Sequence, residues 1–506
     1  MSEHREVETK WSPEPDAAVP DLGGLPDVAR TSAPRIHELV ATYIDTTDLA
    51  LARAGVSLRR RTGGEDDGWH LKVPEGRDRI EVRAPLGRAV RTPPVALRRA
   101  VVAWTRGAAL SPVATIATLR EVVDLLHEDG RVLAQLADDL VVGTPADGEA
   151  PVEWRQWELE LMEGDAALLA AAEQLLAGLG VPVSASQLKL ETVLGDRMPQ
   201  PEDLGKPSPD EPAGGILHRR LKEQVAELFR RDSEVRRGVP DAVHQVRVAC
   251  RRLRGALATF GPLVDPAITD PLRDELRWLA HSLGAARDAE VVHDRLRAMV
   301  AQEPSDLLVG PVRRRIDRTY ATRARENNAS VDAVLGSDRY LALLAGLDTL
   351  VAAPPWTHRA DDSARDVALR RIRKDWKRLQ RRVTTAQAST GVDELAAHDE
   401  ALHAARKAAK RLRYSCEAVE PVWGKEARRL RKSAQHITRV LGERQDTVVS
   451  RHDLAAISSA AQAADESTFT YGRLHAREEA LAETLQLEFD RVWRKASRSK
   501  VRAWLG

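Results

Sequence analysis

The hydrophobic pattern of the chain changes its period at one segment, residues 198–215, which is rich in proline and glycine and poor in large apolar residues. Before this segment, apolar and polar residues alternate; after it, apolar residues recur every three to four positions. A period of two is typical of β-strands, and a period near 3.6 is typical of α-helices. The sequence therefore predicts an α+β chain of two domains, with a strand-rich domain over 1–197, a linker over 198–214 and an all-helical domain over 215–506.

Short alternating segments separated by Gly, Asp and Pro predict the strands of the first domain. They cover residues 6–11, 37–46, 56–62, 68–73, 78–84, 131–143 and 155–164. Helical spacing interrupts them near 93–105 and 165–179. In the second domain, helical spacing covers residues 216–231, 241–260, 271–283, 287–301, 364–383, 395–419, 425–441 and 467–495.

The composition excludes several classes of protein. Charged residues make up 30% of the 506 residues, and no stretch approaches the apolar length of a membrane-spanning helix. The first residues contain no apolar run, so we expect no secretion signal. Two cysteines, Cys250 and Cys416, are too few for a disulfide scaffold or a cysteine zinc site, and they fit a reducing cytosol.

The two domains differ in charge. Residues 1–200 contain 22 Lys and Arg against 32 Asp and Glu, whereas residues 201–506 contain 55 against 44. A basic domain indicates a polyanionic partner. Aromatic residues make up only 4% of the chain, which disfavours single-stranded nucleic acid, because its bases stack on aromatic side chains.

The predicted strands carry charged residues of both signs at positions two apart, which share one face of a strand. These positions are Glu6, Glu8 and Lys10, then Arg59 and Arg61, then His70 and Lys72, then Arg79, Glu81 and Arg83, and finally Glu158 and Glu160. An ordinary half-exposed sheet explains any one of these strands. A sheet curled into a barrel with a charged interior explains their recurrence better. Its cations would hold phosphate oxygens, and its carboxylates would hold hard divalent metal ions.

The helical domain contains an internal repeat. The pattern His-x-x-Arg-x-x-x-(Arg/Lys)-Arg-Leu-Arg begins at His244 and again at His403, 159 residues later. The pattern Leu-Gly-x-x-x-Asp begins at Leu283 and again at Leu441. Two elements in the same order at nearly one offset indicate a pair of similar, pseudo-symmetric helical bundles.

Each copy of the first pattern places a basic stripe beside the apolar face of its helix. At about 100° per residue, the four basic positions of a copy fall within roughly 80° of arc. A solvated basic face is the alternative for either helix alone, but the repetition favours a surface that faces an anion. For the two histidines, a structural role and contact with a ligand are equal alternatives. The stripes consist of His244, Arg247, Arg251, Arg254, His403, Arg406, Lys410 and Arg413.

The ordered motifs of the first domain resemble those of the CYTH family, the triphosphate tunnel metalloenzymes. Glu6-Val-Glu8-Thr-Lys10 is similar to the ExExK signature of this family, and Leu58-Arg59-Arg60-Arg61 is similar to its LRxR strand. Further similar elements are Tyr43-Ile-Asp45-Thr46, Lys72, Arg79-Ile-Glu81, Arg120, Ala137-Asp138-Asp139, Trp157-Glu158-Leu-Glu160-Leu and Ser186-Gln-Leu-Lys189. The resemblance covers about residues 4–196 and implies an antiparallel β-barrel that forms a tunnel for a triphosphate.

The resemblance also implies the roles of individual residues. The triphosphate would be bound by Lys10, Arg59, Arg61, Lys72, Arg79, Arg120 and Lys189. One or two Mg²⁺ or Mn²⁺ ions would be held by Glu6, Glu8, Asp138, Glu158 and Glu160. Alternation leaves open whether Asp138 or Asp139 faces inward. The expected catalytic set is Glu6, Glu8, Lys10 and Glu81, of which Glu81 would hold a water or orient a lysine.

The implied reaction is hydrolysis of a terminal phosphoanhydride. No nucleoside or thiamine pocket can be read from the sequence, so inorganic triphosphate or a short polyphosphate is the preferred substrate. The basic helices and their repeat resemble the CHAD domain over about residues 215–506. That resemblance implies binding of inorganic polyphosphate, and we expect a cytoplasmic protein associated with polyphosphate granules.

Two other functions stay open from the sequence. One is a tunnel that captures phosphate chains without turnover. The other is nucleic-acid binding through the basic helices, which the low aromatic content and the absence of a known DNA-reading motif disfavour. Salt separates this last function from polyphosphate binding, because non-specific DNA binding weakens steeply as salt increases.

Overall fold

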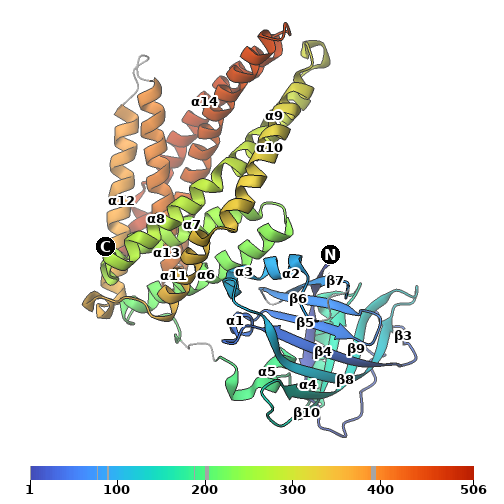
Figure 1. Cartoon of the computed structure of the whole chain (residues 1–506). Helices are drawn as coiled ribbons and strands as arrows, with labels where there is room; N and C mark the ends of the chain where they lie inside the picture. Colours follow the sequence, from blue (N-terminus) through green and yellow to red (C-terminus); the bar gives the residue numbers. More distant parts are fainter. Residues whose placement is uncertain (1, 77, 88–90, 187, 200–203, 389–394) are drawn as a thin grey trace. The chain divides into compact units, whose positions relative to one another are not determined.

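The chain forms two compact units, residues 1–203 and 204–506, in a computed structural model (Figure 1). The structure describes residues 2–76, 78–87, 91–186, 188–199, 204–388 and 395–506. The first unit is built on an antiparallel sheet, and the second is built of helices. The predicted fold class, an α+β chain with a barrel followed by a helical domain, is confirmed. Residues 200–203 of the predicted linker lie outside the described residues.

The sheet of the first unit closes on its own N-terminal segment. Its strands are β1 (Ser2–Glu6), β2 (Glu8–Trp11), β3 (Arg30–Thr31), β4 (Arg35–Asp45), β5 (Ser57–Thr62), β6 (Gly68–Glu75), β7 (Asp78–Ala84), β8 (Ser111–Leu126), β9 (Val132–Pro145) and β10 (Val152–Leu161). They follow the order β1-β7-β6-β5-β4-β8-β9-β10-β2, and β3 pairs with β8. β1 and β2 are consecutive in the chain, yet they pair with β7 and β10 at opposite edges of the sheet. The N-terminal segment therefore joins both edges and produces a near-closed barrel.

One apolar layer of this unit lies outside the barrel, between α4 and the sheet. Helix α4 (Ala166–Gly178) begins after Asp165, whose carboxylate accepts hydrogen bonds from two backbone N–H groups of its first turn. The helix buries Leu168 and Leu176 against Trp157 and its neighbours on the outer face of β10. Because burial on the outside stabilises the sheet, the interior is free to carry charge.

The remaining helices of the first unit are short. They are α1 (Ala50–Arg53), α2 (Val95–Ala100), α3 (Val102–Thr105), α5 (Lys189–Leu194) and the 3₁₀ helix η1 (Gly195–Arg197). The helices predicted near 93–105 and 165–179 correspond to α2, α3 and α4. The sequence did not predict α1 and α5, because helices this short show no apolar period.

In the second unit, a similar order of helices occurs twice along the chain. It contains α6 (Ala213–Arg237), α7 (Ala242–Thr259), α8 (Pro266–Ser282), α9 (Gly284–Ala301), α10 (Val312–Leu335), α11 (Asp338–Ala352), α12 (Ala364–Ala388), α13 (Leu395–Gln462), α14 (Phe469–Ala496) and α15 (Ser499–Arg502). Short 3₁₀ helices lie at η2 (Gly261–Leu263), η3 (Ser305–Leu307), η4 (His358–Asp361) and η6 (Ala503–Leu505). None of the described helices is long and apolar enough to cross a bilayer.

Packing within the second unit follows the internal repeat. α6 packs on α7 and α9 on α10, just as α12 packs on α13 and the later part of α13 packs on α14 (Figure 1). α13 is kinked at Gly424, where φ is 46° and ψ is −114°. The single label α13 therefore covers the counterparts of several helices of the first bundle. α7 turns Val246, Leu253 and Leu257 into the core, whereas Val243, which helical spacing places on the same face, is only half-buried.

Candidate active site in the barrel and basic cluster in the helical unit

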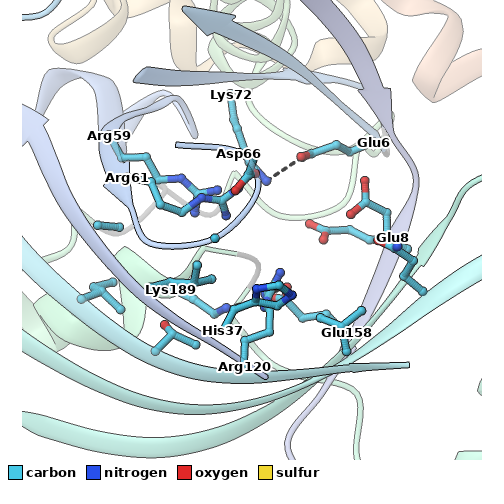
Figure 2. Close-up of a pocket in the computed structure, with 18 of the residues that line it drawn as sticks. Glu6, Glu8, His37, Arg59, Arg61, Asp66, Lys72, Arg120, Glu158 and Lys189 are labelled. Atoms are coloured by element: carbon cyan, nitrogen blue, oxygen red, sulfur yellow. Dashed lines mark hydrogen bonds and ion pairs between the residues drawn. The ribbon is translucent and has the colours of Figure 1, made fainter. Parts of the chain in front are cut away.

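The interior of the barrel encloses a cavity of about 520 Å³, within the size range of small-ligand sites (Figure 2). Side chains from both ends of the sheet order and from its middle converge on it. The structure brings eleven of the predicted site residues to its wall: Glu6, Glu8, Lys10, Arg59, Arg61, Lys72, Arg79, Arg120, Glu158, Glu160 and Lys189. Two others, Glu81 and Asp138, do not line it.

The N-terminal segment contributes alternating charges to this wall. The ammonium of Lys10 lies 2.9 Å from a carboxylate oxygen of Glu8 and 3.3 Å from one of Glu158. Burial alone would favour the neutral amine, but the charges of Glu158 and Glu8 outweigh it and raise the pKa of Lys10. Glu6 pairs with Lys72 of β6 at 2.7 Å (Figure 2). Lys10 therefore keeps its positive charge, and both lysines lie beside carboxylates.

A second charged group forms where β8, β9 and β10 meet α5. Arg120 donates hydrogen bonds to Asp139 at 2.7 and 2.6 Å and to Glu158 at 2.6 Å. Lys189, the first residue of α5, pairs with Asp139 and lies 3.2 Å from Glu158. Burial opposes ionisation of Asp139, but Arg120 and Lys189 lower its pKa. Two cations and two carboxylates are thus fixed side by side.

The prediction that Asp138 holds a metal is corrected by its position. Asp138 accepts hydrogen bonds from Arg155 at 2.9 and 2.6 Å, and Arg155 also donates to the carbonyl of Ala17. Asp139, which is fully buried, is the member of the pair that reaches Arg120. Successive strand residues point to opposite faces, so only one of the two can face the cavity.

Glu81, which we expected in the catalytic set to hold a water or orient a lysine, does not line the cavity. Its side chain is fully buried behind the cavity wall. His70 lies 2.9 Å from its carboxylate, Arg59 3.7 Å and Lys72 3.8 Å, while Arg83 pairs with its other oxygen. Glu81 therefore pairs with Arg59, Lys72 and Arg83, and that it orients a lysine of the site stays a prediction.

Four carboxylates gather on one side of the cavity and provide a donor set for a divalent cation. Burial raises the pKa of Glu160 to about 7, and the charges of Glu6, Glu8 and Glu158 act in the same direction against that of Lys72. A hard cation that prefers carboxylate oxygens would relieve this repulsion, so the donor set fits Mg²⁺ or Mn²⁺. Within the described ranges, no three acidic, His or Cys side chains are already arranged around a common metal position.

The helical unit brings the two basic stripes together. Burial lowers the pKa of Lys410 to about 7, and the positive charges of Arg406, Arg251, Arg413 and Arg247 contribute in the same direction. Lys410 therefore lies close enough to interact electrostatically with arginines from both copies of the repeat. We call Arg247, Arg251, Arg406, Lys410 and Arg413 the basic cluster.

The family model of the CYTH domain matches residues 4–183, and that of the CHAD domain matches residues 219–455. The chain is a CYTH and CHAD domain-containing protein. It is 36% identical over 520 residues to "Uncharacterized protein MT2285" of Mycobacterium tuberculosis (strain CDC 1551 / Oshkosh), with 98% of this chain and 97% of the relative covered.

Two solved structures are similar to parts of the chain. "PptA from Streptomyces chartreusis" has a TM-score of 0.48 and 21% identity, covering 56% of this chain and 99% of that one. The CHAD domain from the plant Ricinus communis has a TM-score of 0.41 and 24% identity, covering 61% of this chain and 96% of that one.

Not every predicted residue of the CHAD stripes joins the basic cluster. Burial lowers the pKa of Arg254, and Arg277 and Arg273 of α8 add to the effect, so Arg254 faces other arginines. Arg413 belongs to the basic cluster and also pairs with Glu417 at 3.0 Å. Burial lowers the pKa of His403, with Lys407 and Arg406 adding to the effect, and His403 shares a hydrogen bond with Gln445.

The two repeated patterns of the CHAD domain contact each other in both copies. Arg247 donates a hydrogen bond to the carbonyl of Gly284 at 3.2 Å. In the second copy, the guanidinium of Arg406 lies over Gly442, where a Cβ would come within 3.4 Å of it. The arginine of the first pattern therefore lies beside the glycine of the second pattern in each copy of the repeat. The side chain of Asp288, which ends the first copy of the second pattern, lies outside the described residues.

Sequence reasoning missed several residues of the CYTH cavity. Arg35, His37 and Tyr43 of β4 line it, and Tyr43 accepts a hydrogen bond from Arg59 at 3.2 Å. Their period of two was a signal that could have revealed them. Asp66, which pairs with Arg61, lies in the loop between β5 and β6, where no periodicity applies.

Proposed function

We propose that the CYTH domain hydrolyses inorganic triphosphate or short polyphosphate chains with Mg²⁺ or Mn²⁺, and that the CHAD domain binds polyphosphate. The observation that carries this proposal is the convergence of four of the predicted carboxylates and all seven predicted phosphate-binding cations on one cavity. The carboxylates are Glu6, Glu8, Glu158 and Glu160, and the cations are Lys10, Arg59, Arg61, Lys72, Arg79, Arg120 and Lys189.

The cations of the wall would bind the non-bridging oxygens of the phosphate chain. Arg59 and Lys72 are held from behind by Glu81, so their charges are positioned before substrate arrives. Arg120 and Lys189 are positioned in the same way by Asp139. Such fixed charge stabilises the transferring phosphoryl group without reorganisation of the site.

The carboxylates Glu6, Glu8, Glu158 and Glu160 would hold the metal. When bound, the ion would supply charge neutralisation and an activated water. In the structure, Lys10 and Lys72 neutralise part of this acidic group, so their ammonium groups would be released to phosphate as metal binds. Lys10 would then stand at the boundary between carboxylates and phosphate oxygens.

A capture-only tunnel is the alternative, and the acidic side of the cavity argues against it. Cations alone suffice to bind a phosphate chain. Carboxylates next to the chain repel it unless a metal ion lies between them. Six carboxylates line this cavity, and burial together with the neighbouring carboxylates raises the pKa of one of them, Glu160, to about 7. An arrangement that weakens simple capture is expected where a metal completes the site.

Phosphate release from tripolyphosphate with Mg²⁺ and with Mn²⁺ tests this proposal. We expect release by the full chain and a loss of about 10²–10³ in rate for Glu6→Ala and for Lys10→Ala. Glu3→Ala is the matched control, because Glu3 lies on the same strand as Glu6, is exposed and does not line the cavity. Tight tripolyphosphate binding with no release under either metal would establish the capture-only function instead.

A further inference from the structure

Helix α12 carries a row of exposed basic side chains on the face opposite its packing face. Its members are Arg370, Arg373, Lys374, Lys377 and Arg381, which we call the α12 stripe. The buried face of the same helix consists of Ile372, Trp376, Leu379 and their neighbours. The spacing of three and four residues keeps the stripe straight over about 16 Å. Together with Gln380 and Thr384 it lines an open groove.

The basic side chains of the stripe are not neutralised by ion pairs within the part of the chain that the structure describes. Among the described residues, no carboxylate forms an ion pair with any of its five members. α12 contains two acidic residues. Asp375 is buried and accepts hydrogen bonds from Ser415 at 2.6 Å, besides pairing with Arg411 at 2.7 Å. Asp366 lies in the first turn of the helix, before the stripe begins.

Helix α6 is the counterpart of α12 in the first copy of the repeat, and its basic residues are paired differently. α6 aligns with α12 at an offset of 151 residues, so that Arg219-Arg220-Leu221 corresponds to Arg370-Arg371-Ile372, and Arg230-Arg231 corresponds to Arg381-Arg382. In α6 these arginines are neutralised by carboxylates: Arg220 pairs with Glu223 at 2.8 Å, and Arg230, the counterpart of the stripe residue Arg381, pairs with Glu227 at 2.9 Å and with Glu234 at 2.6 Å.

All three neutralising acids are replaced in α12. The positions that correspond to Glu223, Glu227 and Glu234 hold Lys374, Arg378 and Thr385. The arginines are kept while their partners become cations or a neutral donor. Like charges three and four residues apart destabilise a helix, so this pattern is unfavourable without an external anion.

We infer that the α12 stripe is a second polyphosphate-binding surface, separate from the basic cluster, that engages long chains. This inference rests on the proposed function of the CHAD domain. A single straight row of cations fits a linear polymer charged at every unit. The only aromatic residue of α12, Trp376, is buried, so the stripe offers no surface on which bases could stack.

The position of the helix explains why chain length should matter. α12 packs on α13, which carries Arg406, Lys410 and Arg413 of the basic cluster. A chain held by the cluster and long enough to pass around α12 would meet the stripe as an intramolecular ligand, with a gain in affinity and no new partner. A short chain would fill only one of the two surfaces.

The test removes four charges from the stripe of the full chain, with Arg370→Gln, Lys374→Gln, Lys377→Gln and Arg381→Gln. The matched control removes four exposed charges from α10, with Arg313→Gln, Arg314→Gln, Arg318→Gln and Arg325→Gln. We expect the α12 variant to bind long-chain polyphosphate at least about tenfold more weakly at physiological salt, with a log–log salt slope lower by about three. Release of phosphate from tripolyphosphate and the affinity of the control should stay unchanged.

The outcomes separate this inference from the proposed function. An equal loss of affinity for long-chain polyphosphate in the α12 and α10 variants would mean that the net charge of the protein determines binding. This result would overturn the inference. So would unchanged long-chain binding in the α12 variant while Arg251→Gln in the basic cluster weakens it. Duplex DNA that competes as well as polyphosphate would assign the stripe to nucleic acid instead. A wild-type chain that binds no polyphosphate would overturn both the inference about the α12 stripe and the proposed function of the CHAD domain. Because the variant removes repulsion between like charges, we expect its unfolding temperature not to fall. A lower unfolding temperature would therefore show that the variant is misfolded.

Discussion

The guanidinium of Arg120 makes two hydrogen bonds to the carboxylate of Asp139, at 2.7 and 2.6 Å. The two residues stand opposite each other in the register of β8 and β9, so the pair is built into the sheet. Lys189 reaches the same carboxylate from α5. One buried acid therefore positions two of the cations that we propose bind phosphate.

The substitution Asp139→Asn should destabilise the CYTH domain by about 3 kcal/mol, because it leaves two close cations without their shared counter-charge. Urea unfolding measures this loss, and tripolyphosphate should restore much of it by supplying the missing anion. Asp138→Asn is the matched control, since Asp138 pairs with Arg155 on the outer face. Equal effects at the two neighbours would contradict the assignment of inner and outer faces.

Glu160 should make the stability of the metal-free protein depend on pH. Its pKa is raised from an ordinary value of 4.5 to about 7, so the folded state binds more protons than the unfolded state between these values. Stability should therefore fall as pH rises from about 4.5 to 7, by on the order of 3 kcal/mol. Glu160→Gln should flatten this dependence in unfolding curves recorded at pH 5 and pH 8.

The same carboxyl group should couple metal binding to proton release. Divalent ions need the ionised carboxylate, so Mg²⁺ affinity should rise with pH up to about 7 and then level off. Calorimetry in buffers of different ionisation enthalpy would detect the released proton near pH 6. A Mg²⁺ affinity that is the same at pH 6 and pH 8 would place Glu160 outside the metal site.

Two adjacent arginines of α7 should differ in their importance for polyphosphate. Arg251 lies in the basic cluster near Lys410, whereas Arg252 pairs with Glu417 at 3.1 Å. Arg251→Gln should weaken polyphosphate binding about tenfold, because one charge-assisted contact to phosphate is lost. Arg252→Gln should leave the affinity nearly unchanged. Fluorescence anisotropy with a labelled chain distinguishes the two, and equal losses would remove the cluster as the binding site.

Lys410 should take up a proton when polyphosphate binds. Its pKa in the free protein is lowered to about 7 by burial and by the surrounding arginines, and a bound anion offsets both effects. Affinity should therefore fall as pH rises above 7, by up to tenfold per pH unit. Lys410→Arg, which matches Arg251 of the first repeat and stays charged, should bind without this pH dependence. Calorimetry at pH 8 in two buffers would measure the proton uptake directly.

The alternation of residues in the first half was sufficient to group most of the CYTH site. Glu6, Glu8 and Lys10 are two positions apart, and a strand places such residues on one face whatever its neighbours are. The same reasoning failed at Asp138 and Asp139. Apolar residues occupy both faces of β9 around them, so the local pattern does not indicate which face of the strand points into the barrel. Only the pairing with β8, which sets Arg120 opposite Asp139, decided the inner residue.

Local spacing in the sequence predicted most strands and helices and the repeated basic helices, because backbone geometry relates positions two, three or four apart in the chain. It did not predict α1, α5, α10 or α11. Tertiary structure decided what these faces meet. It set Glu81 behind the wall and brought Arg251 within reach of Lys410, which follows it by more than a hundred residues. It also left the α12 stripe on the surface. Such relations depend on sheet closure and on the packing of helices, and these are properties of the whole chain rather than of any local segment.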